Sequence, residues 1–307
     1  MLDYKVWDRL NIVAPDKSME GRVKELFQKS GLPISFEKER SNIGKVAGRW
    51  INKVVFERPQ EIPELIAAGY FDVAIVGEDW IADWGYEFPV LLSMAIGRSK
   101  NQAVRIVLAV PKSCEVKDCM GRPAYDVPYA GVVFTEYVRL TKKYFESIGR
   151  SDVKIKASHG NTEAKVRYGA DGIVDVTETG ASLEANGLIV ISTLMESNTV
   201  IIANPDSLAD EEKKQRIEWF VRLIKGAYAA IAYMKIIANV PEEILKQAAE
   251  IVGGLKGPTC APIYGKEGWF ALSAIVPKSQ WDRISFELLQ IGVTDIIPKW
   301  DIPCIMT

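Results

Sequence analysis

Short apolar stretches alternate with helical patterns over the first two thirds of the chain. The stretches are rich in β-branched residues and have the length of strands. Between them, residues 19–30 place Val23, Leu26 and Phe27 on one helix face, and residues 137–148 repeat the pattern with an apolar residue every fourth position. This alternation predicts α/β domains with mostly parallel sheets. The predicted strands are 10–14, 54–56, 73–76, 104–110, 131–134, 153–156, 172–176, 189–192 and 199–203.

The pattern changes after residue 209. Residues 209–230 favour one long amphipathic helix with an acidic first turn, where the helix dipole prefers negative charge. The order that follows is β-α-β-β-α-β, which predicts a separate α+β domain of the ferredoxin-like type. Its strands are expected at 233–239, 259–264, 269–276 and 295–297, and its helices at 241–251 and 279–291.

Length and charge narrow the class of protein. A chain of 307 residues with 48% hydrophobic content exceeds what one core usually holds, so more than one domain is expected. With 38 basic against 40 acidic residues the net charge is −2, which attracts neither nucleic acid nor an anionic membrane. The N-terminus, Met1 to Asp8, is acidic where a signal peptide is apolar, and no apolar run approaches the ~18 residues of a membrane span. We expect a cytoplasmic protein without nucleic-acid or membrane partners.

Cysteine and histidine are scarce. Cys114, Cys119, Cys260 and Cys304 are too few for a disulfide scaffold, so reduced thiols are expected. Their spacing does not favour structural zinc, because the only histidine is His159. That single histidine also excludes Ser-His-Asp and Cys-His hydrolase mechanisms, unless His159 itself is the base. We expect His159 to be a loop residue.

Residues 172–188 are the most informative stretch. A predicted strand ends at Asp175 and Val176, and a loop leads into a short helix. Gly180 lets an anion approach the backbone, and hydroxyls and N–H groups of a helix start face the same point, which predicts a phosphate cradle. The lysine of an ordinary NTPase loop is absent. On spacing alone, a helix capped by Ser182 or Thr179 is the simpler interpretation.

The order Asp-x-x-x-Thr-Gly-x-Ser-Leu-x-x-Asn-Gly-Leu, from Asp175 to Leu188, resembles the phosphoribosyl-pyrophosphate loop of the ATP phosphoribosyltransferases, which open histidine biosynthesis. The likeness extends over nearly the whole chain. Residues 72–79, 135–145 and 160–163 are similar to further segments of that family, and residues 255–259, with Gly268, Trp269 and Gly292, resemble the regulatory domain of its long form.

The resemblance implies a fold and a domain plan. Two α/β lobes similar to periplasmic binding proteins would form the catalytic unit, the first from 1–97 and 190–211 and the second from 98–189. Residues 212–307 would form the regulatory domain. The active site would lie in the cleft between the lobes, at the carboxyl ends of the strands.

The implied reaction is attack by N1 of the adenine of ATP on the anomeric carbon of phosphoribosyl pyrophosphate, with loss of pyrophosphate. It needs little acid–base catalysis, and Mg²⁺ would be carried mainly by the substrate phosphates. The N-terminal segment from Lys17 to Arg22 holds more residues than the family pattern, so which of the two reaches substrate stays open. The residues implied for phosphoribosyl pyrophosphate are Asp175, Thr177, Glu178, Thr179, Gly180, Ala181 and Ser182, and those for ATP are Lys17, Arg22, Arg58, Asp79 and Tyr137.

The regulatory domain is expected to bind histidine, the end product, through Asn239, Leu255 and Thr259, and to favour a less active hexamer over dimers. Without the family, most of these residues have ordinary explanations: Asp79 as a helix cap, Tyr137 as a helix-surface group, Thr259 as a loop hydroxyl. A non-enzymatic two-lobed binding or sensor protein is the rival hypothesis, because the same architecture serves both. A phosphoribosyltransferase acting on another base is a third.

Overall fold

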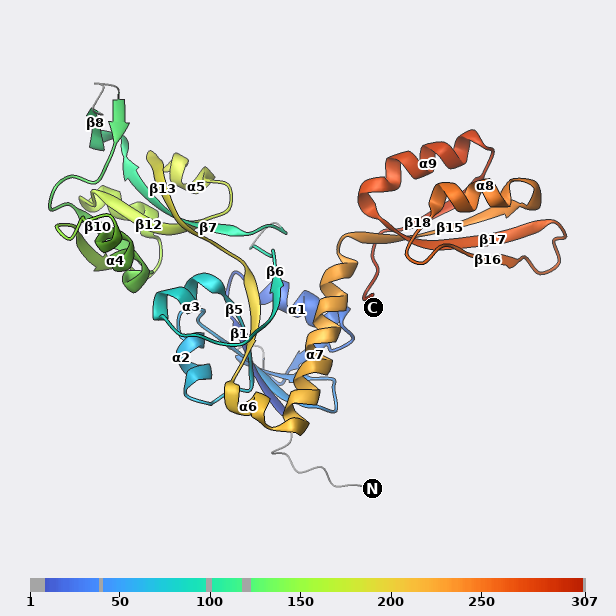
Figure 1. The fold of residues 1–307 in the computed structure, drawn as a ribbon, viewed down its shortest axis with the longest axis horizontal. Coiled ribbons are helices and arrows are strands. Elements are labelled where there is room, and N and C mark those ends of the chain that lie inside the picture. Colours follow the sequence, from blue (N-terminus) through green and yellow to red (C-terminus); the bar gives the residue numbers. More distant parts are fainter. Residues whose placement is uncertain (1–8, 39–40, 98–100, 118–122, 306–307) are drawn as a thin grey trace. The chain divides into compact units, whose positions relative to one another are not determined.

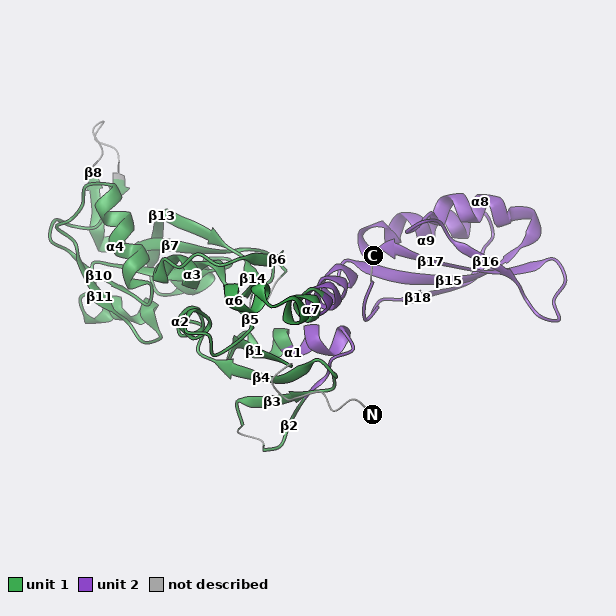
Figure 2. Ribbon diagram, turned by 60° about the horizontal axis from the view of Figure 1, so that its bottom comes forward, with its two compact units in different colours: residues 1–23, 35–218 green, residues 24–34, 219–307 purple. Residues whose placement is uncertain are grey.

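The computed structural model describes residues 9–38, 41–97, 101–117 and 123–305. The N-terminal residues Met1 to Asp8 and Cys119, which entered the sequence predictions, lie outside that range. The chain divides into two compact units, unit 1 with residues 1–23 and 35–218 and unit 2 with residues 24–34 and 219–307 (Figure 2). Unit 1 holds two lobes, each built on its own sheet (Figure 1).

Lobe I is built on a mixed sheet with the strand order β2-β3-β4-β1-β5-β14-β6. Its centre is parallel, because β1 pairs with β4 and with β5 in the same direction, and β14 runs antiparallel to β5 and β6. Residues 73–76 of β5 have no exposed surface, as expected of a strand buried on both faces. The strands are β1 Leu10–Pro15, β2 Ile34–Phe36, β3 Ile43–Val46, β4 Ile51–Glu57, β5 Val73–Gly77, β6 Val90–Met94 and β14 Thr199–Ala203, and the helices are α2 Ile62–Ala67, α3 Glu78–Trp84 and α6 Pro205–Ala209. Helix α1, Glu20–Lys29, begins in this unit and continues into unit 2.

Lobe II has the strand order β11-β10-β12-β7-β13. Strands β11, β10 and β12 are parallel, whereas β7 is antiparallel to both β12 and β13. Its strands are β7 Val104–Pro111, β10 Val132–Thr135, β11 Lys154–Ala157, β12 Gly172–Thr177 and β13 Leu188–Ser197, with a side hairpin of β8 Glu115–Lys117 and β9 Pro123–Tyr125. Its helices are α4 Val138–Ser147 and α5 Ala181–Ala185, with short 3-10 helices at Lys112–Cys114 and Thr162–Tyr168.

The chain crosses between the lobes twice, once between β6 and β7 and once at Asn198, between β13 and β14. The predicted return to lobe I at residue 190 is therefore too early, because β13 continues along β7 as far as Ser197 with two register shifts. The expectation of mostly parallel sheets is also corrected. Strands β7, β13 and β14 lie next to the crossings and are antiparallel to the strands they pair with, which makes both sheets mixed.

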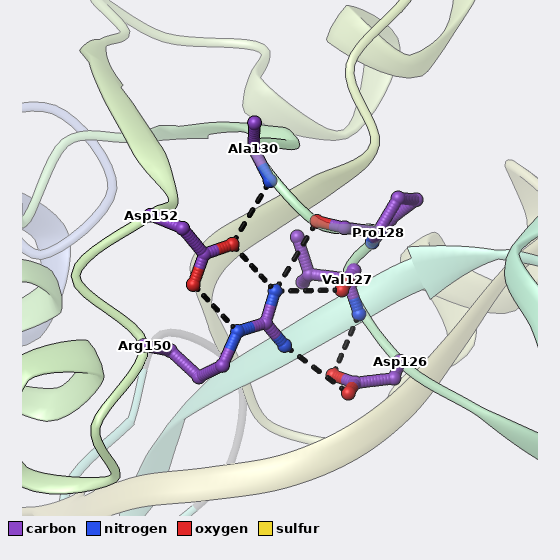
Figure 3. A network of polar contacts seen from close by, with 6 residues as sticks. All are labelled: Asp126, Val127, Pro128, Ala130, Arg150 and Asp152. Atoms are coloured by element: carbon purple, nitrogen blue, oxygen red, sulfur yellow. Dashed lines mark hydrogen bonds and ion pairs between the residues drawn. The ribbon is translucent and has the colours of Figure 1, made fainter.

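Arg150 fastens a loop of lobe II (Figure 3). Its guanidinium donates to both oxygens of Asp152, at 2.9 and 3.0 Å, and to the carbonyls of Val127 and Pro128. Asp152 also accepts a 2.9 Å hydrogen bond from the N–H of Ala130. The Arg150 hydrogen bonds, followed by that of Ala130, lower the pKa of Asp152 to about 2.

Unit 2 contains the β-α-β-β-α-β sandwich that the sequence predicts. Its antiparallel sheet has the order β16-β17-β15-β18, and alternate residues of β15 pack with α8 and α9 in one core. The elements are β15 Tyr233–Pro241, α8 Glu242–Val252, β16 Thr259–Pro262, β17 Trp269–Pro277, α9 Trp281–Gln290 and β18 Thr294–Lys299, with a 3-10 helix at Lys278–Gln280.

Helix α7, Glu211–Ala230, runs through the division between the units, so the predicted boundary at 212 falls within its first turn. Residues 24–34 belong to unit 2 because α1 packs there: the ring of Phe27 lies 5.5 Å from that of Phe220, and Lys29 donates a 2.7 Å hydrogen bond to Asp301. No described helix is both long and apolar enough to cross a membrane.

Candidate active site

A cavity of about 80 Å³ lies between the lobes of unit 1. The carboxyl ends of β1, β5 and β12 contribute to its wall, which is the edge where open α/β sheets bind ligands. Residues of both crossings complete the wall. The residues that line it include Pro15, Gly77 and Asp79 from lobe I, Tyr137 and Val176 from lobe II, and Gly97 and Ser197 from the crossings.

Asp79 is the most enclosed carboxylate of this site, with 5% of its surface exposed. The phenol of Tyr137 donates a 2.6 Å hydrogen bond to Asp79 Oδ2, and the hydroxyl of Ser197 donates one of 2.6 Å to Asp79 Oδ1. Burial raises the pKa of the Asp79 carboxyl, although the hydrogen bonds from Ser197 and Tyr137 oppose that shift. The predicted nucleotide residues Asp79 and Tyr137 are thus brought together, and Tyr137, 3% exposed, is not a helix-surface group.

Helix α3 of lobe I and helix α4 of lobe II contact each other beside this carboxylate. The rings of Trp80 and Tyr137 stack with their centroids 4.3 Å apart. One turn along, the guanidinium of Arg139 lies 3.9 Å above the ring of Trp84. Aromatic and cation–π contacts of this kind hold the two helices at a fixed distance.

The loop after β12 is organised by its own hydroxyls. The N–H of Gly180 donates a 2.9 Å hydrogen bond to Thr177 Oγ1, and the N–H of Ala181 donates to Thr179 Oγ1 at 3.4 Å. Gly180 has φ +84° and precedes α5 without a side-chain cap, so Ser182 is inside the helix and not its capping residue. The Ser182 hydroxyl instead donates a 2.9 Å hydrogen bond to Glu163.

Asp175 and Glu178 connect this loop to its surroundings. Asp175 Oδ1 accepts a 2.7 Å hydrogen bond from the N–H of Val176, which lines the cavity. Glu178 lies against Gly97 so closely that a Cβ on Gly97 would come within 2.6 Å of its carboxylate. Its carbonyl also accepts a 3.4 Å hydrogen bond from the Gln102 side chain. The loop therefore contacts the first crossing between the lobes.

The three predicted cationic residues lie near the carboxyl ends of β1 and β4. Lys17 is exposed in the turn after β1, and Arg58 is exposed directly after β4. Arg22, in the first turn of α1, donates a 2.9 Å hydrogen bond to Asn101. None of the three lines the cavity itself, but Ser18 and Pro59, beside Lys17 and Arg58, do.

The sequence predictions missed several neighbours of this site. Ser197 and Trp80 were not expected to line it. Ser197 lies between two predicted apolar strands, 189–192 and 199–203. Glu57 was also missed; burial and the nearby Glu61 and Asp16 raise the pKa of its carboxyl. His159 is exposed in the loop after β11.

Possible metal ligands are dispersed. Among the described residues no three or more His, Cys, Asp or Glu side chains are grouped to hold a metal ion. The three cysteines in that part of the chain, Cys114, Cys260 and Cys304, are free thiols.

In unit 2, two of the residues predicted to bind histidine share a surface. Asn239 of β15 pairs with Ala271, and Thr259 of β16 pairs with Ser273, on the sheet face opposite to α8 and α9. Leu255 is 40% exposed, and its N–H donates a 3.0 Å hydrogen bond to the carbonyl of Ile275 in β17.

Comparison with known proteins gives one family for the whole chain. Residues 58–226 match the family model of HisG, ATP phosphoribosyltransferase, and residues 230–298 match that of the HisG C-terminal domain. ATP phosphoribosyltransferase 1 of Geobacter sulfurreducens is 33% identical over 289 residues, with 94% of this chain and 96% of the relative covered. The ATP phosphoribosyltransferase of Chlorobium phaeobacteroides is 33% identical over 290 residues, with 94% of each chain covered.

A solved structure from the same family is similar to this chain. A chain of the ATP phosphoribosyl transferase (HisG:HisZ) complex from Thermotoga maritima superposes with a TM-score of 0.58 and 25% identity, covering 70% of this chain and 96% of that one. The rival hypothesis of a binding or sensor protein rested on architecture alone, whereas the family models and the relatives match by sequence. The chain therefore belongs to the ATP phosphoribosyltransferase family, in the long form that carries a C-terminal domain.

Proposed function

We propose that the cavity between the lobes is the centre of the site where phosphoribosyl is transferred from phosphoribosyl pyrophosphate to N1 of ATP, with release of pyrophosphate. The observation that carries this proposal is that residues of both lobes line one cavity. Val176, near the carboxyl end of β12 and just before the loop at residues 177–182, lines the same cavity as Asp79 and Tyr137. The loop proposed for the phosphate therefore begins beside the pair of residues proposed for the nucleotide.

The phosphoribosyl pyrophosphate side of the site belongs to lobe II. Asp175 would accept hydrogen bonds from the ribose hydroxyls, and residues 177–182 would surround the 5′-phosphate. The space beside Gly180 is open, since a Cβ built there meets no atom within 4 Å. The N–H groups of Gly180 and Ala181 are already bonded to Thr177 and Thr179, so the hydroxyls and the open backbone face provide the phosphate contacts.

The ATP side belongs to lobe I and the start of α4. Asp79 and Tyr137 would position the adenine, and Lys17, Arg22 and Arg58 would balance the polyphosphates. Guanidinium groups suit phosphate because they stay charged and donate two parallel hydrogen bonds. Glu61 and Asp16 are near enough to Glu57 to raise the pKa of its carboxyl, after the larger effect of burial.

The reaction asks mainly for positioning and charge stabilisation. The pyrophosphate leaving group is stable, and the single histidine of the chain, His159, is exposed in the loop after β11 and is not among the residues that line the cavity. Bound Mg²⁺ supplies neutralisation of the phosphate charge. Within the described part of the chain no cluster of carboxylates is built to hold an ion, which fits an ion that arrives on the substrate phosphates, because Mg²⁺ usually takes one or two protein carboxylates and several waters.

Substrate entry requires the lobes to separate. Sites for ligands of this size occupy ~300–1,000 Å³, and the cavity holds about 80 Å³. We infer that the lobes open about the two crossings and close on the bound substrates, which excludes water from the cationic transition state.

Unit 2 is the regulatory part in this proposal. Histidine would bind near Asn239, Leu255 and Thr259, on and beside the sheet face that α8 and α9 leave free, and homo-oligomers would shift from dimers toward a less active hexamer. A small ligand between subunits links binding to assembly when it binds the two states unequally.

The test is an assay with the full chain, ATP, phosphoribosyl pyrophosphate and Mg²⁺, in which phosphoribosyl-ATP is followed by its ultraviolet absorbance. Parallel reactions replace ATP by GTP, CTP and free nucleobases. Turnover only with ATP supports the proposal; pyrophosphate release with another base and none with ATP contradicts it. Added histidine should lower the rate and increase the mass of the assembly in solution.

A further inference from the structure

Ser197 of lobe II contacts Asp79 of lobe I at the end of β13. It is the last residue of β13, directly before the chain crosses back to lobe I at Asn198, and 2% of its surface is exposed. Its hydroxyl makes two hydrogen bonds to one residue: it donates to Asp79 Oδ1 at 2.6 Å and accepts from the Asp79 N–H at 3.1 Å. One oxygen atom at the end of β13 is thus bonded to both the side chain and the backbone of Asp79.

The Asp79 carboxylate is held at both oxygens. Tyr137 donates to Oδ2 from lobe II, while Ser197 donates to Oδ1 from the crossing. The carboxylate cannot rotate without breaking one of these bonds. Gly77 completes the arrangement, since a Cβ at that position would overlap Asp79 Oδ1. Serine, tyrosine and glycine from three segments therefore fix one orientation.

We propose that Ser197 is a positioning residue for the nucleotide: it holds the Asp79 carboxylate in the orientation that receives a hydrogen-bond donor of the adenine. Ser197, Asp79 and Tyr137 all line the cavity, so the held carboxylate lies at its wall. The exocyclic amine beside N1 is the donor that adenine offers. Because small displacements of a reacting group cost large factors in rate, the orientation of Asp79 governs how N1 is presented.

The inference rests on the proposed assignment of Asp79 to ATP. A merely structural role for Ser197 makes a different prediction, because a hydroxyl that only satisfies a buried carboxylate affects stability and both substrates alike. A positioning role affects ATP selectively. It also affects protonation, since removing a donor disfavours the charged carboxylate.

The surroundings of Asp79 allow this effect to be read from a pH profile. The Tyr137 phenol contacts it directly, and Asp83 lies one turn along α3 with Arg139 of α4 at 4.0 Å from its carboxylate. Glu78, the preceding residue, accepts a 2.8 Å hydrogen bond from the N–H of Asn198. All remain in a Ser197 variant. Burial already raises the pKa of Asp79, and loss of the Ser197 hydrogen bond raises it further.

A matched control exists in the same unit. Ser207 is also buried, and its hydroxyl donates a 2.7 Å hydrogen bond to the buried carboxylate of Asp72, which does not line the cavity. Ser207→Ala removes the same kind of bond without touching the site. Both variants should lose comparable stability, so that only the effect on ATP separates them.

The experiment compares the full-chain variants Ser197→Ala, Ser197→Thr, Ser207→Ala and Asp79→Asn by steady-state kinetics with both substrates. Ser197→Ala should raise KM for ATP by roughly ten-fold, because losing one hydrogen bond to a charged group weakens binding by about that factor. KM for phosphoribosyl pyrophosphate should stay within about two-fold, and the acid limb of kcat/KM for ATP should move to higher pH. Ser197→Thr should restore both values, and Ser207→Ala should change neither.

Two results overturn the inference in distinguishable ways. If Asp79→Asn raises KM for ATP while Ser197→Ala leaves it and the pH profile unchanged, Asp79 contacts the nucleotide but Ser197 does not position it. If Asp79→Asn itself leaves KM for ATP unchanged, the nucleotide assignment fails and the inference with it. Should Ser197→Ala not fold, Ser197→Cys replaces it: a thiol is a weak donor of similar size, and unchanged KM for ATP in that variant overturns the inference as well.

Discussion

Asp83 of α3 accepts a 2.8 Å hydrogen bond from the N–H of Leu140, so a carboxylate of lobe I caps the first turn of α4 in lobe II. Helix α4 has no capping side chain of its own, because Tyr137 at its N-cap makes no such hydrogen bond. Asp83 Oδ2 also lies 4.0 Å from the guanidinium of Arg139. The start of α4, and with it the place of Tyr137 in the site, depends on the other lobe.

We expect Asp83→Ala to lower the free energy of unfolding by about 1–2 kcal/mol, the usual cost of losing a helix cap. Asp83→Asn keeps an acceptor oxygen and should lose less. Urea denaturation followed by tryptophan fluorescence measures the difference, since Trp80 and Trp84 lie on α3. Identical midpoints for wild type and Asp83→Ala would show that the cap contributes nothing.

Gly180→Val should abolish binding of phosphoribosyl pyrophosphate, because its side chain occupies the open space proposed for the 5′-phosphate. Gly180 has φ +84°, so any side chain there is also strained. Gly149, after α4, offers a matched control with φ +73° and no atom within 4 Å of a built Cβ. Calorimetric titration of both valine variants separates the two effects: if Gly149→Val loses the same affinity, backbone strain is the cause and the loop is not the phosphate site.

Arg58→Ala should weaken ATP binding more than binding of phosphoribosyl pyrophosphate. The exposed guanidinium directly follows β4, and its neighbour Pro59 lines the cavity. Lys142→Ala, which removes one positive charge from the exposed side of α4, serves as the control for net charge. Equal losses for the two substrates in Arg58→Ala would remove its assignment to ATP.

The strands and helices with strong periodicity were predictable from the sequence. Every predicted strand of the first two thirds overlaps an observed one, and the order of elements in unit 2 is the observed order. Short strands toward the edges of the lobe I sheet were missed: β2, β3 and β6 have only a few residues and lack a long β-branched run. Helix α3 was missed as well, because it follows β5 without a loop and its burial comes from packing on α4.

The site was predictable only where one segment carries the signal. The loop from Asp175 to Ser182 is contiguous, so its spacing was visible in the sequence. Ser197 meets Asp79 across 118 positions of the chain, and no local pattern marks such a contact. The return crossing at Asn198 was misplaced for the same reason, since the pairing of β13 with β7 is a long-range property.

Asp152→Asn should destabilise unit 1 in a pH-dependent way. The pKa of Asp152 is lowered to about 2 in the folded chain, chiefly by Arg150 (Figure 3). A carboxyl whose pKa is lowered on folding contributes stability above its unfolded value of 3.8 and loses that contribution as the pH falls toward 2. Thermal melts of wild type and variant should therefore differ at pH 7 and converge near pH 2. A constant difference across that range would mean that the ionised carboxylate is not the stabilising species.

Inhibition by histidine is expected to depend on Thr259. Thr259 and Asn239 lie on the sheet face of unit 2 that α8 and α9 do not cover, with β17 between their strands. A hydroxyl and an amide on that face can bind the carboxylate and the ammonium of an amino acid. Thr259 is exposed and takes no part in the core of unit 2, so its side chain can be shortened without loss of packing.

Thr259→Ala should lose most of the inhibition by histidine and keep its turnover, because the residues proposed to bind the two substrates all belong to unit 1. Ser285→Ala, which removes a hydroxyl from α9 on the other side of the sheet, should stay fully sensitive. A shortened chain is a poorer test, since a cut near Asp210 also removes Lys213, whose ammonium donates a 2.7 Å hydrogen bond to the buried Asp72 of unit 1. Coupling between two sites amounts to ~1–3 kcal/mol, which is large enough for a clear shift of the histidine concentration that halves the rate. If Thr259→Ala is inhibited like the wild type, histidine binds elsewhere or this face has another role.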